Sequence, residues 1–414
     1  MINELKKEVE KKYGKKVENR GDCEKISSAI LELMDIDISY NTIRRLYKLV
    51  PFTNPNKKTL DTLAKFTGYK NYFHFTQTYS VNEKTKLYQI TYKYIYDNDD
   101  LEILKLIKKT KRSSEGFIDF LTLLIRELFY LKKYELISSI FNLEELRHSN
   151  FSYSEILYFG NSVGLILRKE NQVNKVLVNN INFLNCIYLI FVDYSSLNSY
   201  YGKWANTLKN FKTTSEIEVF NQAILEFKRF LNNKKLEHNV ESLIYKRGFH
   251  PILSSRFIAL HLLSKTVLNP TEVLTKYCKV HPKTKYLTDY FYELFTTSIL
   301  TKNIVVMKFL IQKINLKVLH LYQKEHLNSF YLMSAFYYRL TSIKVGQLKN
   351  YSRFNLNESR NSYEEFIKLL NLIYLYDATT HKAEKKQVLL QYKLLSEKLN
   401  YPYFSKEFLI NYFK

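Results

Sequence analysis

Glycine and proline are scarce in this chain, and their scarcity restricts the fold more than any other feature of the sequence. The 414 residues include only nine Gly and six Pro, while 46% of the residues are hydrophobic. All-β and Rossmann-type folds need many tight turns, which glycine supplies. We therefore predict an all-α protein whose helices are joined by short polar connections. A chain of this length also exceeds the usual size of one compact domain.

The most specific local pattern lies just before residue 50 and predicts a short helix with two different faces. Apolar residues recur at i, i+3, i+4 and i+7, which turns one side of a helix toward a core. Ser39 stands at the N-cap position, where its hydroxyl can accept a free backbone N–H. A helix with an apolar back and a basic front fits the DNA major groove. The apolar residues are Ile43, Leu46, Tyr47 and Val50, and the polar ones are Asn41, Arg44, Arg45 and Lys48.

Predicted helices on both sides of this segment supply a small core for it. Residues 22–34 read as the preceding helix, with Ile26, Ala29, Ile30 and Leu33 on one face. Asn54-Pro55-Asn56 starts a following helix over 57–67, and Gly68 suits the left-handed position that ends it. An aromatic run then completes the core: Tyr69, Tyr72, Phe73 and Phe75.

Residues 20 to 78 resemble the helix-turn-helix domains of Cro-type (XRE-like) regulators. The resemblance rests on S-x-x-T-[IL]-R-R-L, then T-L-D-x-[LI]-A-x-[FY]-x-G-Y-x-x-[FW]-x-x-F, approximated here by Ser39, Thr42, Ile43, Arg44, Arg45, Leu46, Thr59, Leu60, Asp61, Leu63, Ala64, Phe66, Gly68, Tyr69, Tyr72 and Phe75. It implies a helix-turn-helix domain, placed at residues 1–80, that binds double-stranded DNA. The expected DNA-binding residues are Tyr40, Asn41, Thr42, Arg44, Arg45, Lys48, Lys57 and Lys58.

Local charge supports this interpretation more strongly than whole-chain charge. Residues 39–70 contain seven Lys or Arg and one acid, a net charge of +6, whereas residues 1–38 have a net charge of −1. The whole chain is +23, which favours polyanionic partners. However, Tyr, Phe, Asn and Ile share AT-rich codons with Lys, so genome composition offers another explanation for the lysines. A merely solvated face on the helix at Tyr40 is the alternative interpretation.

From about residue 83 onward the sequence predicts helix after helix, assigned to a C-terminal domain at 81–414. Two helices per repeat give a period of about 30 to 40 residues, which resembles tetratricopeptide-like α-solenoids in period and helicity only. Gly160 and Gly164, one turn apart, indicate close helix packing. The expected helices begin near Glu83, Leu101, Phe117, Tyr134, Ser152, Gln172, Phe183, Glu216, Val240, Ser254, Pro270, Thr284, Ile304, Leu327, Ser362 and Lys382.

Motifs for catalysis and cofactor binding are missing from the sequence. It contains no P-loop, dinucleotide-binding, nucleophile-elbow or zincin motif. An acidic cluster of Asp97, Asp99, Asp100 and Glu102, with Lys105, loosely resembles a nuclease pattern. Asp99 as an N-cap with Glu102 at the third helical position explains the same residues without a metal ion. We therefore expect no enzyme activity, no cofactor and no metal ion.

The cysteines and the hydropathy pattern favour a cytoplasmic protein. Cys23, Cys186 and Cys278 are isolated and odd in number, which implies neither a disulfide framework nor a cysteine zinc site. The N-terminus lacks the apolar core of a signal peptide. No run approaches the ~20 apolar residues of a membrane span. We expect no membrane association.

These features favour a sequence-specific transcriptional regulator whose helical-repeat domain forms a homodimer or senses a peptide or protein. Two alternatives stay open. The chain would be a protein-interaction scaffold if the N-terminal domain does not bind DNA, or a DNA-binding component of a defence or mobile-element system.

Overall fold

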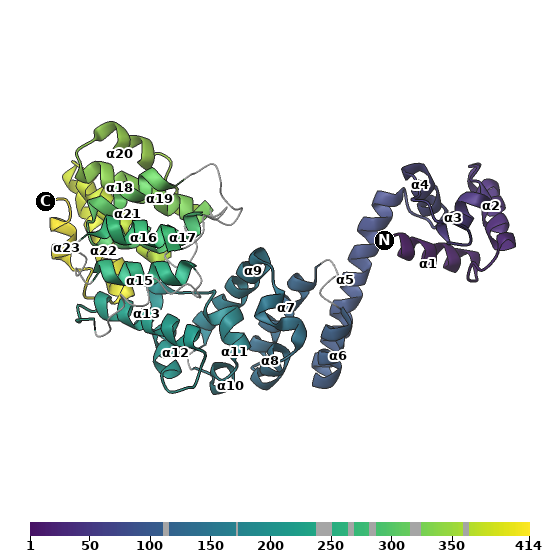
Figure 1. The fold of residues 1–414 in the computed structure, drawn as a ribbon, viewed down its shortest axis with the longest axis horizontal. Helices are drawn as coiled ribbons and strands as arrows, with labels where there is room; N and C mark the ends of the chain where they lie inside the picture. Colours follow the sequence, from purple (N-terminus) through teal and green to yellow (C-terminus); the bar gives the residue numbers. More distant parts are fainter. Residues whose placement is uncertain are drawn as a thin grey trace. The chain divides into compact units, whose positions relative to one another are not determined.

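A computed structural model describes residues 1–110, 116–170, 173–236, 251–263, 269–280, 287–314, 324–358 and 364–414. Every regular element in these ranges is helical, which confirms the all-α prediction. The chain divides into two compact units, Met1–Thr110 and Lys111–Lys414, each described by itself below (Figure 1). None of the helices in these ranges is both long enough and apolar enough to cross a bilayer.

The first unit encloses a small core. Side chains from α1 to α4 and the first turn of α5 meet there. Ile26, Ile30 and Phe75 are buried as expected, together with Leu63 and Ala64. The prediction that Leu33 and Phe73 lie in the core is wrong, because their side chains are 67% and 70% exposed. The helices are α1 (Ile2–Tyr13), α2 (Arg20–Met34), α3 (Tyr40–Leu46), α4 (Lys57–Phe66), α5 (Tyr72–Tyr96) and α6 (Asp100–Thr110).

Asn56 and Gly68 mark the two ends of α4. The Asn56 side chain accepts the Thr59 backbone N–H at 2.8 Å, which caps the first turn. Gly68 has φ +95° and ends the helix in the left-handed position, as predicted. Asp61 accepts the Tyr72 backbone N–H at 2.9 Å, so α4 also holds the start of α5.

Helix α5 begins earlier than the sequence indicated. It starts after Asn71, whose side chain accepts the His74 backbone N–H at 2.8 Å, and it continues through Glu83, where a separate helix was expected to start. Residues 72–96 contain neither Gly nor Pro, so nothing in that stretch breaks the helix. The predicted division at residue 80 falls within α5, and the compact units divide after Thr110.

The second unit consists of many short and medium helices, most of which begin where expected. Of the expected starts in the described residues of this unit, those near Phe117, Tyr134, Ser152, Glu216, Ser254, Pro270, Ile304, Leu327 and Lys382 lie within three residues of an observed one, as does the start near Leu101 in the first unit. Those near Gln172, Val240, Thr284 and Ser362 lie outside the described residues. Phe183 ends a single turn that passes into a π-helix over Leu184–Tyr188.

The α-helices of this unit are α7 (Phe117–Tyr130), α8 (Tyr134–Phe141), α9 (Tyr153–Gly164), α10 (Lys175–Val178), α11 (Ile181–Phe183), α12 (Tyr200–Leu208), α13 (Ser215–Leu231), α15 (Pro251–Leu263), α16 (Pro270–Val280), α17 (Leu287–Leu300), α18 (Ile304–Lys313), α19 (Lys324–Leu340), α20 (Lys344–Tyr351), α21 (Glu364–Ala378), α22 (Lys382–Leu399) and α23 (Lys406–Asn411). Short 3-10 turns lie between some of them, at Glu144–Leu146, His148–Asn150, Leu165–Lys169, Tyr194–Ser196 and Leu356–Glu358.

One type of turn joins four pairs of consecutive helices. The middle residue of each three-residue turn has φ between 52° and 61°, in the left-handed region. The backbone N–H groups of this residue and of the residue after it donate hydrogen bonds to carbonyls of the preceding helix, which closes that helix end. The turns are centred on Asn98 (α5 and α6), Lys132 (α7 and α8), Lys302 (α17 and α18) and Ser342 (α19 and α20).

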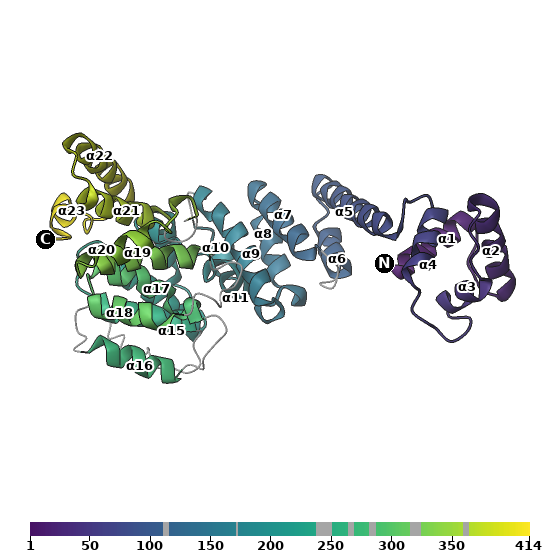
Figure 2. The same ribbon diagram turned by 90° about the horizontal axis from the view of Figure 1, so that it is seen from above.

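Helices from successive pairs also contact one another. Helix α13 packs on α15, α15 on α17, α17 on α19 and α19 on α21, while α16 packs on α18. Figure 2 shows α15 to α20 grouped within this part of the chain. Gly160 and Gly164 of α9 face the segment that follows the π-helix so closely that a Cβ at Gly164 would lie 2.2 Å from the Phe191 Cβ. The predicted close packing is therefore confirmed.

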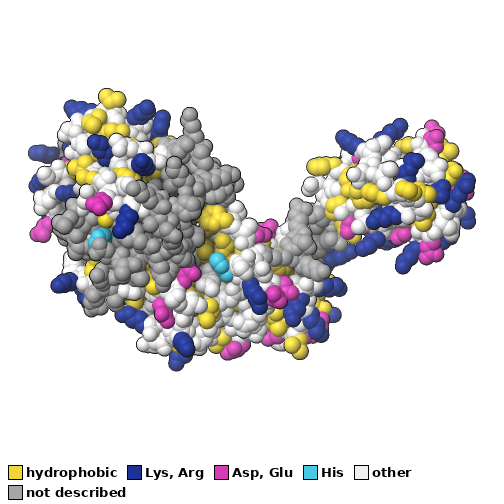
Figure 3. Space-filling model, viewed as in Figure 1, with side chains coloured by type: hydrophobic (Ala, Val, Ile, Leu, Met, Phe, Trp, Pro, Cys, Tyr) yellow, Lys and Arg dark blue, Asp and Glu magenta, His cyan; other side chains and the backbone are white. Residues whose placement is uncertain are grey.

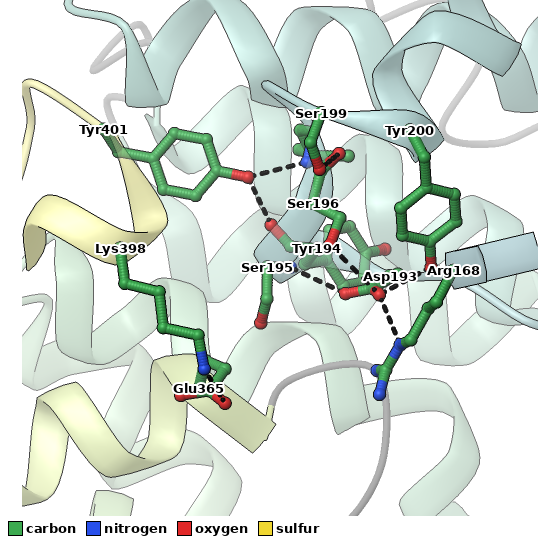
Figure 4. A network of polar contacts seen from close by, with 11 residues as sticks. Arg168, Asp193, Tyr194, Ser195, Ser196, Ser199, Tyr200, Glu365, Lys398 and Tyr401 are labelled. Atoms are coloured by element: carbon green, nitrogen blue, oxygen red, sulfur yellow. Dashed lines mark hydrogen bonds and ion pairs between the residues drawn. The ribbon is translucent and has the colours of Figure 1, made fainter. Parts of the chain in front are cut away.

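The C-terminal segment is fastened to the middle of the second unit. The Tyr401 hydroxyl donates to the Tyr194 carbonyl at 2.8 Å and accepts the Leu197 N–H at 2.7 Å (Figure 4). Asn198 donates its amide to the Asn400 carbonyl at 2.7 Å. The nearby Asp193 carboxylate is 1% exposed and accepts from the side chains of Arg168, Ser196 and Tyr200. These bonds hold the residues that precede α12 in place.

Candidate nucleic-acid interface

Helix α3 is anchored to the core by one side only. Ile43 is 0% and Leu46 is 2% exposed, as their spacing predicted. The Ser39 hydroxyl accepts the Asn41 N–H at 3.3 Å, so Ser39 is the N-cap. Beyond the C-terminal end of the helix, the Tyr47 hydroxyl donates to the Lys6 carbonyl of α1 at 2.9 Å. These contacts fix the rotation of α3 and direct its opposite side toward solvent.

The two arginines of α3 occupy different environments. Arg45 is exposed, whereas Arg44 is half-buried. Arg44 donates Nη1 to the Asn41 side-chain oxygen at 2.9 Å, and among the described residues its buried Nε has no partner. Asn41 and Arg44 therefore form one polar pair, with the exposed Arg45 beside it.

Lys48 does not lie on the helix, although the spacing placed it on the polar face. Helix α3 ends at Leu46, and Lys48 has φ +61°. Its N–H bonds to the Arg45 carbonyl and the Leu49 N–H bonds to the Arg44 carbonyl, which is the arrangement that terminates a helix. The Lys48 side chain is exposed, 6.0 Å from the Phe52 ring centre.

Tyr40 and Thr42 are half-buried in the first turns of α3. The Arg20 guanidinium of α2 lies 5.0 Å from the Tyr40 ring centre, and Arg20 also pairs with Glu24 at 2.6 Å. The fold thus places a cation from α2 beside the start of α3. Because Arg20 is far from Tyr40 in sequence, local spacing gave no indication of this.

Lys6 of α1 adds a second cation, beside the other end of α3. Its ammonium lies 5.3 Å from the Tyr47 ring centre. Partial burial and, second, repulsion from Lys48 lower the pKa of Lys6. Positive charge therefore gathers near Tyr47, and the sequence alone gave no reason to group Lys6 with Lys48.

Lys57 and Lys58 are exposed and form the first two residues of α4. Cations are unfavourable at a helix N-terminus because the helix dipole is positive there. No acidic residue occupies this first turn. Helix stability therefore does not explain the two lysines, and an external anion such as a phosphate would suit them.

The acidic cluster after α5 is accounted for by helix capping. Asp99 accepts the Glu102 N–H at 3.2 Å, as the capping interpretation predicted. Glu102 pairs with Lys105 at 2.6 Å.

Cys23 and Cys186 are buried free thiols, and the Cys278 side chain lies outside the described residues.

No protein-family model, no curated protein and no solved structure matches this chain.

Proposed function

We propose that this protein is a sequence-specific, double-stranded-DNA-binding transcriptional regulator. In this proposal α3 enters the major groove, and the second unit supplies dimerisation and a binding surface for a peptide or protein. The observation that carries the proposal is the division of α3 into a buried side at Ile43 and Leu46 and an outward side with the exposed Arg45. The +6 net charge of residues 39–70 supports it.

The outward residues divide into two roles. Arg45 and the Asn41–Arg44 pair read base edges, because arginine forms bidentate bonds with guanine and asparagine with adenine. Tyr40 and Thr42 flank them at the start of α3. Lys48, Lys57 and Lys58 stand off the helix face and bind phosphates, which sets position rather than sequence preference.

The helical hairpins of the second unit suit a tetratricopeptide-like solenoid. Support comes from the three turns of this type within the unit, at Lys132, Lys302 and Ser342, and from the contacts between alternate helices of α13 to α21. The turn centres Lys302 and Ser342 are 40 residues apart. Stacked helix pairs offer an extended surface for a second copy or a peptide. In a regulator this unit pairs two DNA-binding units.

Selection of bound fragments from random duplex DNA with the full-length protein tests both parts of the proposal. We expect enrichment of one sequence motif, repeated as two half-sites about 10 base pairs apart for a symmetric dimer. Arg45→Ala should then weaken binding to the selected duplex by ~1–3 kcal/mol and binding to a scrambled duplex much less. Lys58→Ala should weaken binding to both duplexes by the same amount.

Lys65→Ala is the matched control, because Lys65 is exposed in the last turn of α4 and outside the proposed contact set. Failure to enrich any sequence would contradict the proposal and favour the protein-interaction scaffold. Equal small effects of Arg45→Ala on both duplexes would contradict the assignment of Arg45 to a base contact.

A further inference from the structure

A groove of about 720 Å³ lies along α12 and α13. These two helices pack against each other in the second unit. Its volume is in the range of sites that hold small organic ligands. Four cationic side chains line it, Lys209, Lys228, Arg229 and Lys234, together with amide side chains such as Asn198 and Asn221.

Positive charge exceeds negative charge in this groove. Four cationic side chains line it, against the carboxylates of Glu218 and Glu226. Glu226 is only 1% exposed, so its carboxylate contributes little to the accessible surface. A groove with this balance favours an anionic ligand.

The Lys228 side chain packs closely against α12. It is half-buried, and a Cβ on Gly202 of α12 would lie 3.0 Å from its Nζ. Lys228 forms no ion pair within the described ranges. Burial and, next, the nearby Lys234 and Lys209 lower its pKa. All three ammonium groups line the same groove, an arrangement that a bound anion would stabilise.

The walls of the groove are held by hydrogen bonds. Asn198 and Asn232 exchange amide bonds at 3.0 and 2.9 Å. Asn221 accepts from the Tyr188 hydroxyl at 3.1 Å and donates to the Ala205 carbonyl at 2.8 Å. The half-buried Phe211 adds an aromatic surface. These bonds hold the amide side chains of the groove in place.

We propose that this groove binds a small phosphorylated ligand of nucleotide size, with its phosphates among Lys209, Lys228 and Lys234. Lysine ammonium groups bind phosphate oxygens through charge-assisted hydrogen bonds, which are stronger than neutral ones. The proposal does not depend on DNA binding by the first unit, because the two sites share no residue.

Isothermal titration calorimetry on the full-length protein tests the proposal, with ADP, pyrophosphate and adenosine as separate probes. ADP should bind and adenosine should not, because only ADP carries phosphate. Lys228→Gln should weaken ADP binding about tenfold or more, as expected for one lost charge-assisted bond. Lys209→Gln and Lys234→Gln, both at exposed positions, should each weaken it in the same direction. Pyrophosphate binding as tight as that of ADP would support the phosphate site and show that the nucleoside adds nothing.

Lys203→Gln is the matched control, because Lys203 is exposed on α12 and does not line the groove. It should leave ADP binding unchanged, and circular dichroism of all variants checks folding. The proposal is overturned if neither ADP nor pyrophosphate binds below about 1 mM. It is also overturned if the three lining-lysine variants bind like Lys203→Gln, or if only a single-stranded oligonucleotide binds.

Discussion

At the scale of single residues, buried polar groups set the shape of the first unit. Asp22 is 2% exposed and accepts from the Tyr13 hydroxyl and from the backbone N–H groups of Glu18 and Asn19 at 3.1 to 3.2 Å. The Lys15 ammonium lies 2.5 Å from its carboxylate. One carboxylate thus fastens the end of α1 to the start of α2, next to the surface that carries Arg20.

The lowered pKa of Asp22 predicts how the stability of the protein depends on pH. The Lys15 ammonium, followed by the Glu18 N–H, lowers the pKa of Asp22 to about 2 in the folded protein. The unfolded value is about 3.9, so its stabilising effect is complete above about pH 5 and is lost as pH falls toward 2. Asp22→Asn should therefore lower the melting temperature at pH 7, and the difference from wild type should shrink between about pH 4 and 2. Calorimetry at several pH values checks this; a difference that stays constant with pH would contradict it.

Lys48 predicts a conflict between stability and function. A non-glycine residue in the left-handed region costs about 1 kcal/mol, which glycine avoids. Lys48→Gly should therefore raise the free energy of unfolding by about 0.5–1 kcal/mol in urea titrations. The same change should weaken binding to all duplexes alike, since a phosphate contact is lost.

Lys132→Gly is the control for Lys48→Gly, because Lys132 has φ +56° in an equivalent turn of the second unit. It should stabilise the protein similarly and leave DNA binding unchanged. Unchanged DNA affinity in Lys48→Gly would remove Lys48 from the proposed interface.

At the scale of helices, the spacing of apolar and capping residues predicted most starts and the buried side of α3. Those features depend on neighbours in sequence, so they are visible there. The position of Lys48 was wrong because the helix-ending turn at Tyr47 is set by backbone hydrogen bonds rather than by residue period. The cations Lys6 and Arg20 come from other helices, and only the packing of α1 and α2 brings them to α3.

The packing of α9 predicts the effect of adding one methyl group. Alanine would favour the helix by up to about 1 kcal/mol over glycine. At Gly164, however, the new Cβ would lie 2.2 Å from the Phe191 Cβ, which is fixed to the backbone and cannot rotate away. Overpacking of this kind costs about 1–3 kcal/mol, so Gly164→Ala should lower the free energy of unfolding overall.

Ser162→Ala, on the same turn of α9 and half-exposed, is the control and should change stability by less than about 0.5 kcal/mol. Urea unfolding followed by circular dichroism measures both variants. A Gly164→Ala variant as stable as wild type would show that α9 and the segment at Phe191 separate easily.

At the scale of the whole molecule, net charge alone does not locate a nucleic-acid surface. On the face drawn in Figure 3, Lys and Arg side chains are spread over both units, with Asp and Glu among them. The +23 total therefore allows DNA to bind through many parts of the chain. We assign DNA binding more narrowly, to α3 and the lysines beside it.

Fluorescence anisotropy of a selected duplex across a salt series tests whether α3 holds the DNA. Wild-type affinity should fall steeply with salt, by ~0.9 in log Kd per log salt for each phosphate neutralised. Arg44→Glu/Arg45→Glu should abolish the preference for the selected duplex and flatten the slope. Lys203→Glu/Lys212→Glu, which makes the same charge change at exposed positions of the second unit, should keep both. Tight, selective binding by Arg44→Glu/Arg45→Glu would show that other basic surfaces hold the DNA and would contradict the assignment to α3.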